Sequence, residues 1–190
     1  TERLVGSEMC IRDSVVRLYE RLNHWLKSNW KFQARKNISY HYDLGNQFYR
    51  EWLDKTMTYS SAIFKNKKEV LSTAQTNKYE SICKNLNLKE GDSVLEIGCG
   101  WGGFAEHAIK TRGVKLTGLT LSKEQLDYSK KRMFELGMAD KSSFLLQDYR
   151  DEKGVYDGVV SIEMFEAVGE KYWPIYFKTI KNSLKSGGLG

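Results

Sequence analysis

A cluster of glycines that follows a short apolar run is the part of this sequence best suited to chemistry. The run, Ser93–Ile97, contains the acidic residue Glu96, and a helical pattern begins directly behind the glycines. Glycine permits positive φ angles and lets a ligand approach the main chain, while the first turn of a helix offers N–H groups without partners. The spacing Gly98-x-Gly100-x-Gly102 differs from the dinucleotide pattern G-x-G-x-x-G, although the next glycine satisfies that pattern too. The segment therefore favours a nucleotide-type ligand over a turn of purely structural use.

The elements that position this segment follow from the periodicity of apolar residues. Short apolar runs predict strands at 93–97, 114–119, 142–146 and 156–162, and helical spacing predicts helices at 69–86, 101–111, 122–137 and 172–184. Strands that alternate with helices predict an α/β fold, with a parallel sheet covered by helices on both faces. Gly187 and Gly188 read as a helix cap leading into another strand, so we expect the final strands of the sheet to lie outside this sequence.

Polar side chains stand where each of these strands ends, and ligands of parallel sheets bind at that edge. The strand ends are 96–100, 120–122, 148–149 and 163–166. A dinucleotide site usually has an acidic residue after the second strand, and residues 118–122 contain none. Asp148, after the third strand, can instead hold an adenine amino group, which favours S-adenosylmethionine over NAD. Ser122 and Gln125 are spaced as a capping box at the start of a helix.

The first 68 residues are predicted to form separate segments. Residues 1–14 have no periodicity and resemble a translated sequencing-adapter scar, so they are excluded as non-native or disordered. Residues 15–30 form a basic amphipathic pattern, which fits either a helix packed on the core or one lying on an anionic membrane. In residues 37–64 aromatic and hydrogen-bonding side chains alternate, with Asp43 as a candidate helix cap, which suits the lid or wall of a pocket. We therefore divide the chain into 1–14, an N-terminal helical lid at 15–68, and an α/β core at 69–190.

Composition excludes several classes of protein. The 190 residues carry a net charge of +6, which permits an acidic partner without requiring one. No apolar run is long enough to span a bilayer, and no signal peptide is visible. Three scattered cysteines form neither a disulfide framework nor a metal site, which indicates a reducing cytosol, and the three histidines are too dispersed to bind a metal.

Six motifs together resemble the cyclopropane-fatty-acyl-phospholipid synthase family, which includes the mycolic acid cyclopropane synthases. They are HYDLGN (41–46), MTYS (57–60), VLEIGCGWGG (94–103), GLTLS (118–122), LQDYRD (146–151) and MFEAVG (164–169). The glycine motif alone indicates only a methyltransferase, whereas the two aromatic-polar motifs before it are much more specific. The resemblance covers residues 38–188 and implies a class I S-adenosylmethionine-dependent methyltransferase fold, Rossmann-like, with a helical lid.

The resemblance also implies which residues contact the donor. Tyr59 and Ser60 would contact it from the lid, and the loop at 94–102 would surround its amino acid part. That loop contributes Glu96, Gly98, Cys99, Gly100 and Gly102, with Cys99 most simply a small packing residue. Further along the chain, the ribose would face Thr120, Leu121, Ser122 and Gln125, and the adenine would be held by Asp148 and Tyr149.

The implied reaction methylates a cis double bond of an unsaturated phospholipid acyl chain and gives a cyclopropane. Attack by the alkene leaves a carbocation, so the pocket should exclude water and present aromatic faces. Candidate faces are those of Tyr42, Phe48, Tyr59 and Phe165. Family members use a bound bicarbonate as the base, and Glu166 matches the glutamate that helps to hold it. The alternative for Glu166 is a carboxylate that caps local N–H groups.

Two departures from the family pattern bear on the product. Ser61 replaces a cysteine that many members have, and it can still donate a hydrogen bond to an anion. Glu163 stands where several members have glycine. The family's later histidine and tyrosine of the bicarbonate site would lie beyond Gly190. Loss of a different proton would give a methylene or methyl-branched chain instead of a ring.

Two other functions compete with lipid methylation. One is a methyltransferase for a small amine or hydroxyl substrate, which would not need the motif at 41–46. The other is an inactive fragment that binds the donor weakly. A nucleic-acid methyltransferase is disfavoured because residues 163–166 lack the Asn/Asp-Pro-Pro-aromatic pattern used on flipped bases. The expected protein is cytoplasmic and peripherally membrane-associated, acts on phospholipid acyl chains, contains no metal and is compatible with a homodimer.

Overall fold

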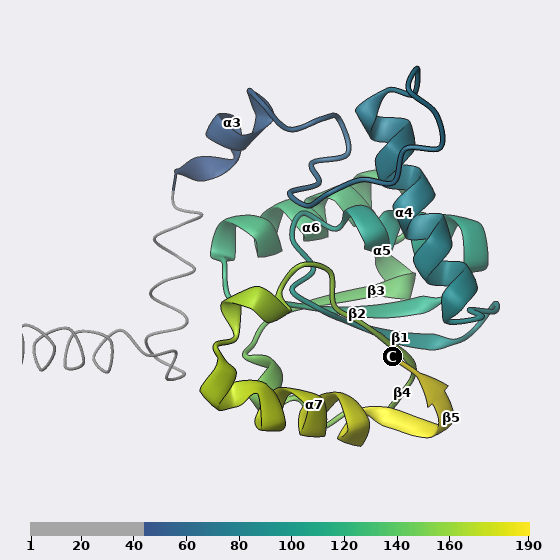
Figure 1. Cartoon of the computed structure of the whole chain (residues 1–190), viewed down its shortest axis with the longest axis vertical. Helices are drawn as coiled ribbons and strands as arrows, with labels where there is room; N and C mark the ends of the chain where they lie inside the picture. The colour runs from purple at the N-terminus through teal and green to yellow at the C-terminus, as the bar shows by residue number, and fades with distance from the viewer. Residues whose placement is uncertain (1–43) are drawn as a thin grey trace, which may run out of the picture. The chain divides into compact units, whose positions relative to one another are not determined.

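The computed structural model describes residues 44–190, and these residues form a parallel sheet with helices on both faces (Figure 1). The predictions for residues 1–14 and 15–30, for Tyr42 and for the cap Asp43 lie outside the described residues. The strands are β1 (Ser93–Ile97), β2 (Lys115–Thr120), β3 (Ser142–Leu146), β4 (Tyr156–Val160) and β5 (Leu184–Leu189). The α-helices are α3 (Gly45–Arg50), α4 (Leu71–Asn85), α5 (Gly103–Arg112), α6 (Lys123–Glu135) and α7 (Trp173–Asn182), and the 3-10 helices are η1 (Ala139–Lys141), η2 (Tyr149–Asp151), η3 (Phe165–Ala167) and η4 (Glu170–Tyr172).

The strand order is β3-β2-β1-β4-β5, and every neighbouring pair is parallel. The order reverses direction between β1 and β4, which is the topological switch point of the sheet. Ligands of open α/β sheets bind in the crevice outside the carboxyl ends of the strands at such a point. The segments that follow Ile97 and Val160 therefore lie where a ligand is expected.

Two apolar layers cover the sheet because successive residues of a strand point to opposite faces. Val94 packs with the buried sides of α4, α5 and α6, including Cys83, Phe104 and Met133. Leu95 and Ile97 lie in the other cluster, against which residues of α7 and β5 pack. Figure 1 shows α4, α5 and α6 on one face of the sheet and α7 on the other. The predicted parallel sheet with helices on both faces is confirmed.

The prediction that the next strand lies outside the sequence was wrong. Leu184–Leu189 forms β5 and pairs with β4, with Tyr156 opposite Leu184. The helix before it ends at Asn182 with Ser183 as the cap, so Gly187 and Gly188 belong to the strand and do not cap the helix. Glycine is uncommon in strands, and the paired backbone of β4 supplies the hydrogen bonds that local sequence preference does not predict.

Other element boundaries moved because glycines or strained residues end them. The helix predicted from Trp101 begins at Gly103, since Gly100 and Gly102 both have positive φ angles. The strand predicted to reach Ile162 stops at Val160. In the segment before the core, Leu44 is the N-cap of α3, and this helix ends before Trp52 and Leu53.

Gly118, in the middle of β2, should not tolerate a side chain. A Cβ atom there would lie 2.7 Å from the ring of Phe144 and 2.9 Å from Cβ of Cys99, both in the core. We expect Gly118→Ala to lower the free energy of unfolding by about 2 kcal/mol, as overpacked cores typically do. Urea denaturation would measure the change, with Gly137→Ala as the control, because nothing lies within 4 Å of Gly137 and only its φ of +67° is unfavourable. Because the control reports only the cost of a positive φ angle, a Gly118→Ala variant as stable as wild type would show that the core accommodates the added Cβ atom.

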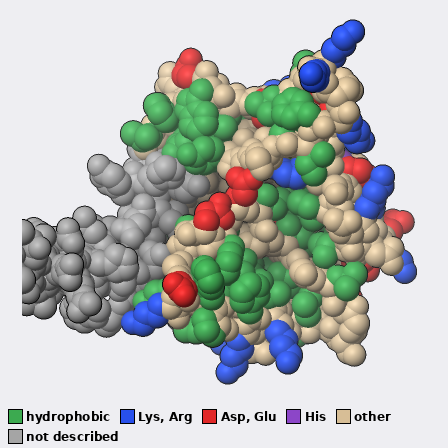
Figure 2. All heavy atoms as spheres, in the orientation of Figure 1, with side chains coloured by type: hydrophobic (Ala, Val, Ile, Leu, Met, Phe, Trp, Pro, Cys, Tyr) green, Lys and Arg blue, Asp and Glu red, His purple; other side chains and the backbone are tan. Residues whose placement is uncertain are grey.

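Two groups of exposed apolar side chains lie on the molecular face shown in Figure 2. One group belongs to α3 and the segment behind it, and comprises Leu44, Phe48, Trp52 and Tyr59. The second belongs to α7 and comprises Trp173, Ile175 and Phe177. Acidic side chains lie between two hydrophobic regions on this face. Soluble domains rarely expose such groups without a partner or ligand.

Candidate functional site

The loop after β1, residues 98–102, which we call the glycine loop, has a left-handed backbone at its three glycines, as the sequence predicts. Gly98, Gly100 and Gly102 have φ angles of +81°, +51° and +77°. The N–H groups of Gly98 and Cys99 both donate to the carbonyl of Leu119, at 3.0 and 2.9 Å, which fixes the loop against β2. Cys99 is buried, and burial raises the pKa of its thiol well above the usual value, which fits a packing residue.

Glu96 is the clearest sign of a ligand beside this loop. Its side chain is only 3% exposed, and its Oε2 atom has no hydrogen-bond partner in the part of the chain that the structure describes. Burial raises the pKa of this carboxyl well above its usual value, and the positive charges of Arg132 and Lys78 only partly oppose the shift. An unpaired buried carboxylate oxygen is costly, so it indicates a site for a cationic or hydrogen-bond-donating ligand.

The segment after β2 forms a buried polar network. The Oγ1 atom of Thr120 donates to Oε1 of Gln125 at 2.8 Å and accepts from the N–H of Ser122 at 3.1 Å. Ser122 caps α6, as the sequence predicts, by accepting from the N–H of Gln125 at 3.3 Å. The reciprocal half of the capping box is absent because the Gln125 side chain binds Thr120 instead. Leu121 lies between these residues and is half-buried.

In the segment after β3, Asp148 forms a bidentate ion pair with Arg150 that was not predicted from the sequence. Arg150 donates from Nε to Oδ1 at 2.8 Å and from Nη2 to Oδ2 at 2.6 Å, and its N–H donates to Oδ1 at 3.0 Å. Both oxygens of Asp148 therefore have an internal partner, although each can accept a further bond. Tyr149 is half-buried, and its pKa is raised mainly by burial. The Asp-x-Arg spacing at a strand end could have indicated this ion pair.

The segment at 57–64, which we call the lid segment, is anchored by α4. Lys78 donates from Nζ to Oγ of Ser60 at 2.5 Å and to the carbonyl of Ser61 at 2.7 Å. The Gln75 amide donates to the carbonyl of Ser60 at 2.8 Å. Burial lowers the pKa of Lys78 to about 8, against the raising influence of Glu163, Asp54 and Glu96. Gln75 and Lys78 were not predicted as site residues, although two polar side chains three residues apart on the buried side of a helix are a usable signal.

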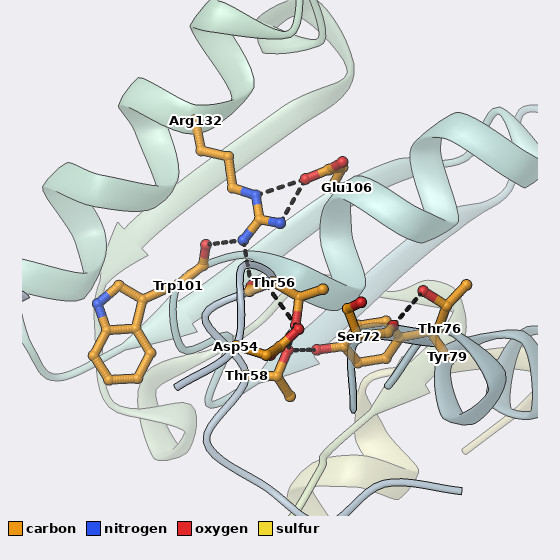
Figure 3. Close-up of polar contacts among 9 residues, drawn as sticks. All are labelled: Asp54, Thr56, Thr58, Ser72, Thr76, Tyr79, Trp101, Glu106 and Arg132. Atoms are coloured by element: carbon orange, nitrogen blue, oxygen red, sulfur yellow. Dashed lines mark hydrogen bonds and ion pairs between the residues drawn. The ribbon is translucent and has the colours of Figure 1, made fainter. Parts of the chain in front are cut away.

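Tyr79, also of α4, and Arg132 of α6 hold the same region (Figure 3). The Tyr79 and Thr58 hydroxyls are 2.6 Å apart and buried. Arg132 pairs with Glu106 through Nε at 2.7 Å and Nη2 at 2.6 Å, while Nη1 donates to the carbonyls of Thr56 and Trp101 at 2.9 and 3.1 Å. One guanidinium thus joins α5, α6, the glycine loop and Thr56, the residue that precedes the lid segment.

The segment after β4 contacts the lid segment directly. Oε1 of Glu163 accepts from the N–H of Ser61 at 2.9 Å and also from its hydroxyl. Tyr59 is exposed and packs edge-on against Trp52 at 5.1 Å. Glu166 is exposed in η3, and its charge contributes to the raised pKa of Tyr176. The structure therefore brings Glu163 to Ser61 and leaves Glu166 at the surface.

The predicted aromatic faces fall into two separate groups. Phe48 belongs to the α3 group, where it packs against Tyr49 and Trp52. Phe165 stacks at 5.0 to 5.3 Å on Trp173, Tyr176 and Phe177 around α7. Each group contacts a segment that follows a strand: Tyr49 of α3 packs on Trp101 at 4.9 Å, and Tyr176 of α7 packs on Tyr149 at 5.4 Å.

The donor that these residues fit is S-adenosylmethionine. Gly100 leaves the glycine loop open to close approach, because nothing lies within 4 Å of where its Cβ atom would be. The unpaired oxygen of buried Glu96 suits a ligand that carries positive charge. S-adenosylmethionine carries an ammonium and a sulfonium group, and it has no pyrophosphate that would need further cations.

Comparisons with known proteins identify the family of the chain. Residues 29–189 match the family described as mycolic acid cyclopropane synthetase. A probable fatty acid methyltransferase of Pseudomonas putida is 43% identical over 165 residues, which cover 86% of this chain and 42% of the relative. The cyclopropane-fatty-acyl-phospholipid synthase of Escherichia coli K12 is 42% identical over 149 residues, which cover 78% of this chain and 38% of that enzyme.

A solved structure matches the chain as well. Mycolic acid cyclopropane synthase CmaA1 complexed with SAH and CTAB matches with a TM-score of 0.77 and 32% identity, over 80% of this chain and 53% of that one. The chain spans about two fifths of the length of the two curated relatives, the probable fatty acid methyltransferase and the E. coli enzyme. With the family matched over residues 29–189, the chain belongs to the mycolic acid cyclopropane synthetase family of S-adenosylmethionine-dependent lipid methyltransferases.

Proposed function

We propose that the protein containing this chain transfers a methyl group from S-adenosylmethionine to the cis double bond of an unsaturated phospholipid acyl chain, giving a cyclopropane fatty acid. The observation that carries the proposal is the juxtaposition of the donor site with the two exposed apolar groups. Glu96 and the glycine loop lie at the carboxyl end of β1, where Tyr49 of α3 packs on Trp101 at 4.9 Å. Tyr176 of α7 packs on Tyr149, which follows β3, at 5.4 Å. A long hydrocarbon chain is the kind of substrate that such apolar groups bind.

The residues of the chain have separate tasks in this reaction. S-adenosylmethionine supplies the methyl group as an electrophile, which the weakly nucleophilic alkene attacks. Glu96, Asp148 and the backbone of the glycine loop hold the donor in place. The lid segment, with Tyr59 and Ser60, covers it and excludes water from the carbocation. The aromatic faces of Phe48, Tyr59 and Phe165 stabilise positive charge on the acyl chain.

The same apolar groups support action at a membrane surface. Among residues 44–190, no helix is long and apolar enough to cross a bilayer. Aromatic side chains exposed beside a lipid-binding site suit the interface between headgroups and acyl chains, as in proteins that lie on a membrane. We therefore place the protein in the cytoplasm at the membrane surface, where it reaches acyl chains of phospholipids.

A second product class has its own support. The relative from P. putida is described as a probable fatty acid methyltransferase, and Ser61 and Glu163 depart from the pattern of the cyclopropane synthases. A shift of hydride from the methylated carbon to its cationic neighbour, followed by loss of a proton from the methyl group, would leave a methylene chain. Loss of a proton from a chain carbon would leave a methyl-branched alkene. Ring closure and methylene formation add the same mass, so only the structure of the product distinguishes them.

The test is to express the full-length natural protein in bacteria with unsaturated membranes and analyse the fatty acids by mass spectrometry and NMR. Acyl chains heavier by one CH2, with high-field cyclopropane proton signals, are expected. The same mass gain with vinylidene signals would favour the methylene product, and the same mass gain with the signals of a methyl group on a double bond would favour the branched chain. Acyl chains that gain no carbon, although the purified protein binds S-adenosylmethionine, would refute lipid methylation and favour a small soluble acceptor.

A further inference from the structure

Glu163 has a backbone conformation that needs an explanation. Its φ angle is +48°, in the left-handed region that glycine adopts readily and other residues adopt at a cost. It lies three residues after the end of β4, next to the switch point of the sheet. The side chain of the adjacent Met164 lies 3.1 Å from the place where a Cβ atom on Gly98 would be. The segment after β4 therefore packs on the glycine loop. Strained residues cluster at functional sites, because the surrounding structure must retain them for a purpose.

The carboxylate of Glu163 is held by one oxygen and open at the other. Oε1 accepts two hydrogen bonds from Ser61, one from the backbone N–H at 2.9 Å and one from the hydroxyl. Among the residues that the structure describes, Oε2 has no hydrogen-bond partner, and the side chain is exposed. One oxygen fixed by two donors orients the carboxylate, while the other remains available to accept a proton.

The same contacts leave no place for a second anion at Ser61. Both of its donors bind Glu163, and its carbonyl accepts from Lys78. Lys78 is the cation of this cluster, and it already faces the charges of Glu163, Asp54 and Glu96. A bicarbonate ion would have to displace the Glu163 carboxylate and then sit beside it, where like charges repel. Bicarbonate therefore does not fit this site.

We infer that the carboxylate of Glu163 takes the place of the bicarbonate ion and is the proton acceptor of the reaction. This inference rests on the proposed function. In the step, the methylated acyl chain carries a positive charge on carbon. A C–H bond of the new methyl group breaks, and its electron pair closes the C–C bond of the ring. The proton passes to Oε2 of Glu163, and the resulting carboxylic acid later releases it to water.

A purely structural role for Glu163 predicts different behaviour. If it only fastened the lid segment to β4, its loss would weaken donor binding, and an added carboxylate would not restore turnover. A proton acceptor contributes typically 10²- to 10⁴-fold to the rate, and a missing one can be replaced by a small anion in solution. Glycine at this position also relieves the positive φ angle, so it should not unfold the protein.

The experiment compares wild type, Glu163→Gly and Glu163→Gln in the full-length protein, in buffers depleted of or supplemented with bicarbonate. We expect wild-type turnover to be unaffected by bicarbonate. Both variants should lose turnover by about 100-fold or more while binding S-adenosylmethionine within a few-fold of wild type. Bicarbonate or formate should restore part of the turnover of Glu163→Gly only, because the glutamine side chain fills the space and its amide is not basic.

A second measurement does not depend on turnover. Line broadening of ¹³C-labelled bicarbonate in NMR should reveal saturable binding to Glu163→Gly and none to wild type. Wild-type activity that requires bicarbonate, saturable binding of bicarbonate by wild type, or full turnover by Glu163→Gly would each overturn the inference. If wild type methylates no lipid, the proposed function fails, and the NMR comparison still tests whether Glu163 displaces the anion. A product that gains CH3 and OH would show that water, not the new methyl group, gives up the proton.

Discussion

Replacing Glu96 with glutamine is expected to weaken the binding of S-adenosylmethionine by about 10- to 150-fold, the effect of losing a hydrogen bond to a charged group. The same substitution should leave the unliganded chain at least as stable. The reason is that Oε2 of Glu96 is buried without a partner, and burial raises the pKa of the carboxyl well above its usual value. A neutral amide of the same shape avoids the cost of burying a charge.

The direction of the pH dependence follows from the raised pKa. An unfolded glutamate has a pKa of about 4.3, whereas folded Glu96 keeps its proton to higher pH. The folded chain therefore binds more protons than the unfolded chain in this window, and its stability falls as pH rises from about 4.3 towards the folded pKa. A positively charged donor favours the ionised form, so its affinity should rise over the same range and binding should release a proton.

Calorimetric titration with S-adenosylmethionine, in two buffers of different ionisation enthalpy, would measure both the affinity and the released proton. Glu135→Gln is the matched control, because Glu135 forms only a surface pair with Lys131 at 3.7 Å and its side chain is 61% exposed. The control should change neither quantity. Unchanged affinity in Glu96→Gln, or a fall in stability equal to that of a core mutation, would contradict a role in donor binding.

The second large effect is expected at Arg132, where alanine should lower the free energy of unfolding by about 3 kcal/mol. The Arg132 side chain is 14% exposed and carries the ion pair with Glu106 as well as bonds to the carbonyls of Thr56 and Trp101. Removing the guanidinium takes away the ion pair of Glu106 and the bonds that Arg132 donates to the two carbonyls. Because Trp101 lies in the glycine loop, donor affinity should fall as well (Figure 3).

Urea denaturation and donor titration would check this prediction beside Lys131→Ala. Lys131 is the adjacent residue on α6, but its ion pair is exposed, so its loss should cost less than about 0.5 kcal/mol. Arg132→Lys should recover part of the stability and little of the donor affinity, because an ammonium group cannot reproduce the planar arrangement of donors. Similar effects of Arg132→Ala and Lys131→Ala would show that the hydrogen bonds to the loop contribute nothing.

The sequence by itself determined the features that depend on residues close together in the chain. Alternating strand and helix patterns fixed a parallel sheet, because periodicity reflects which faces are buried. The glycine loop and the Ser122 cap also depend on neighbours only a few residues apart, and both appear where the sequence places them. The six motifs identified the family before any contact was known.

Only the tertiary structure decided the contacts between distant segments. Ser61 and Glu163 are 102 residues apart, and in the sequence they are two separate departures from the family pattern, whereas the fold joins them. Arg132 meets the carbonyl of Thr56 across 76 residues, and β5 forms because β4 offers an unpaired edge. Glu96 shows the same limit: the sequence places a carboxylate before the glycines, but burial, which no local pattern specifies, gives it an unpaired oxygen and a raised pKa.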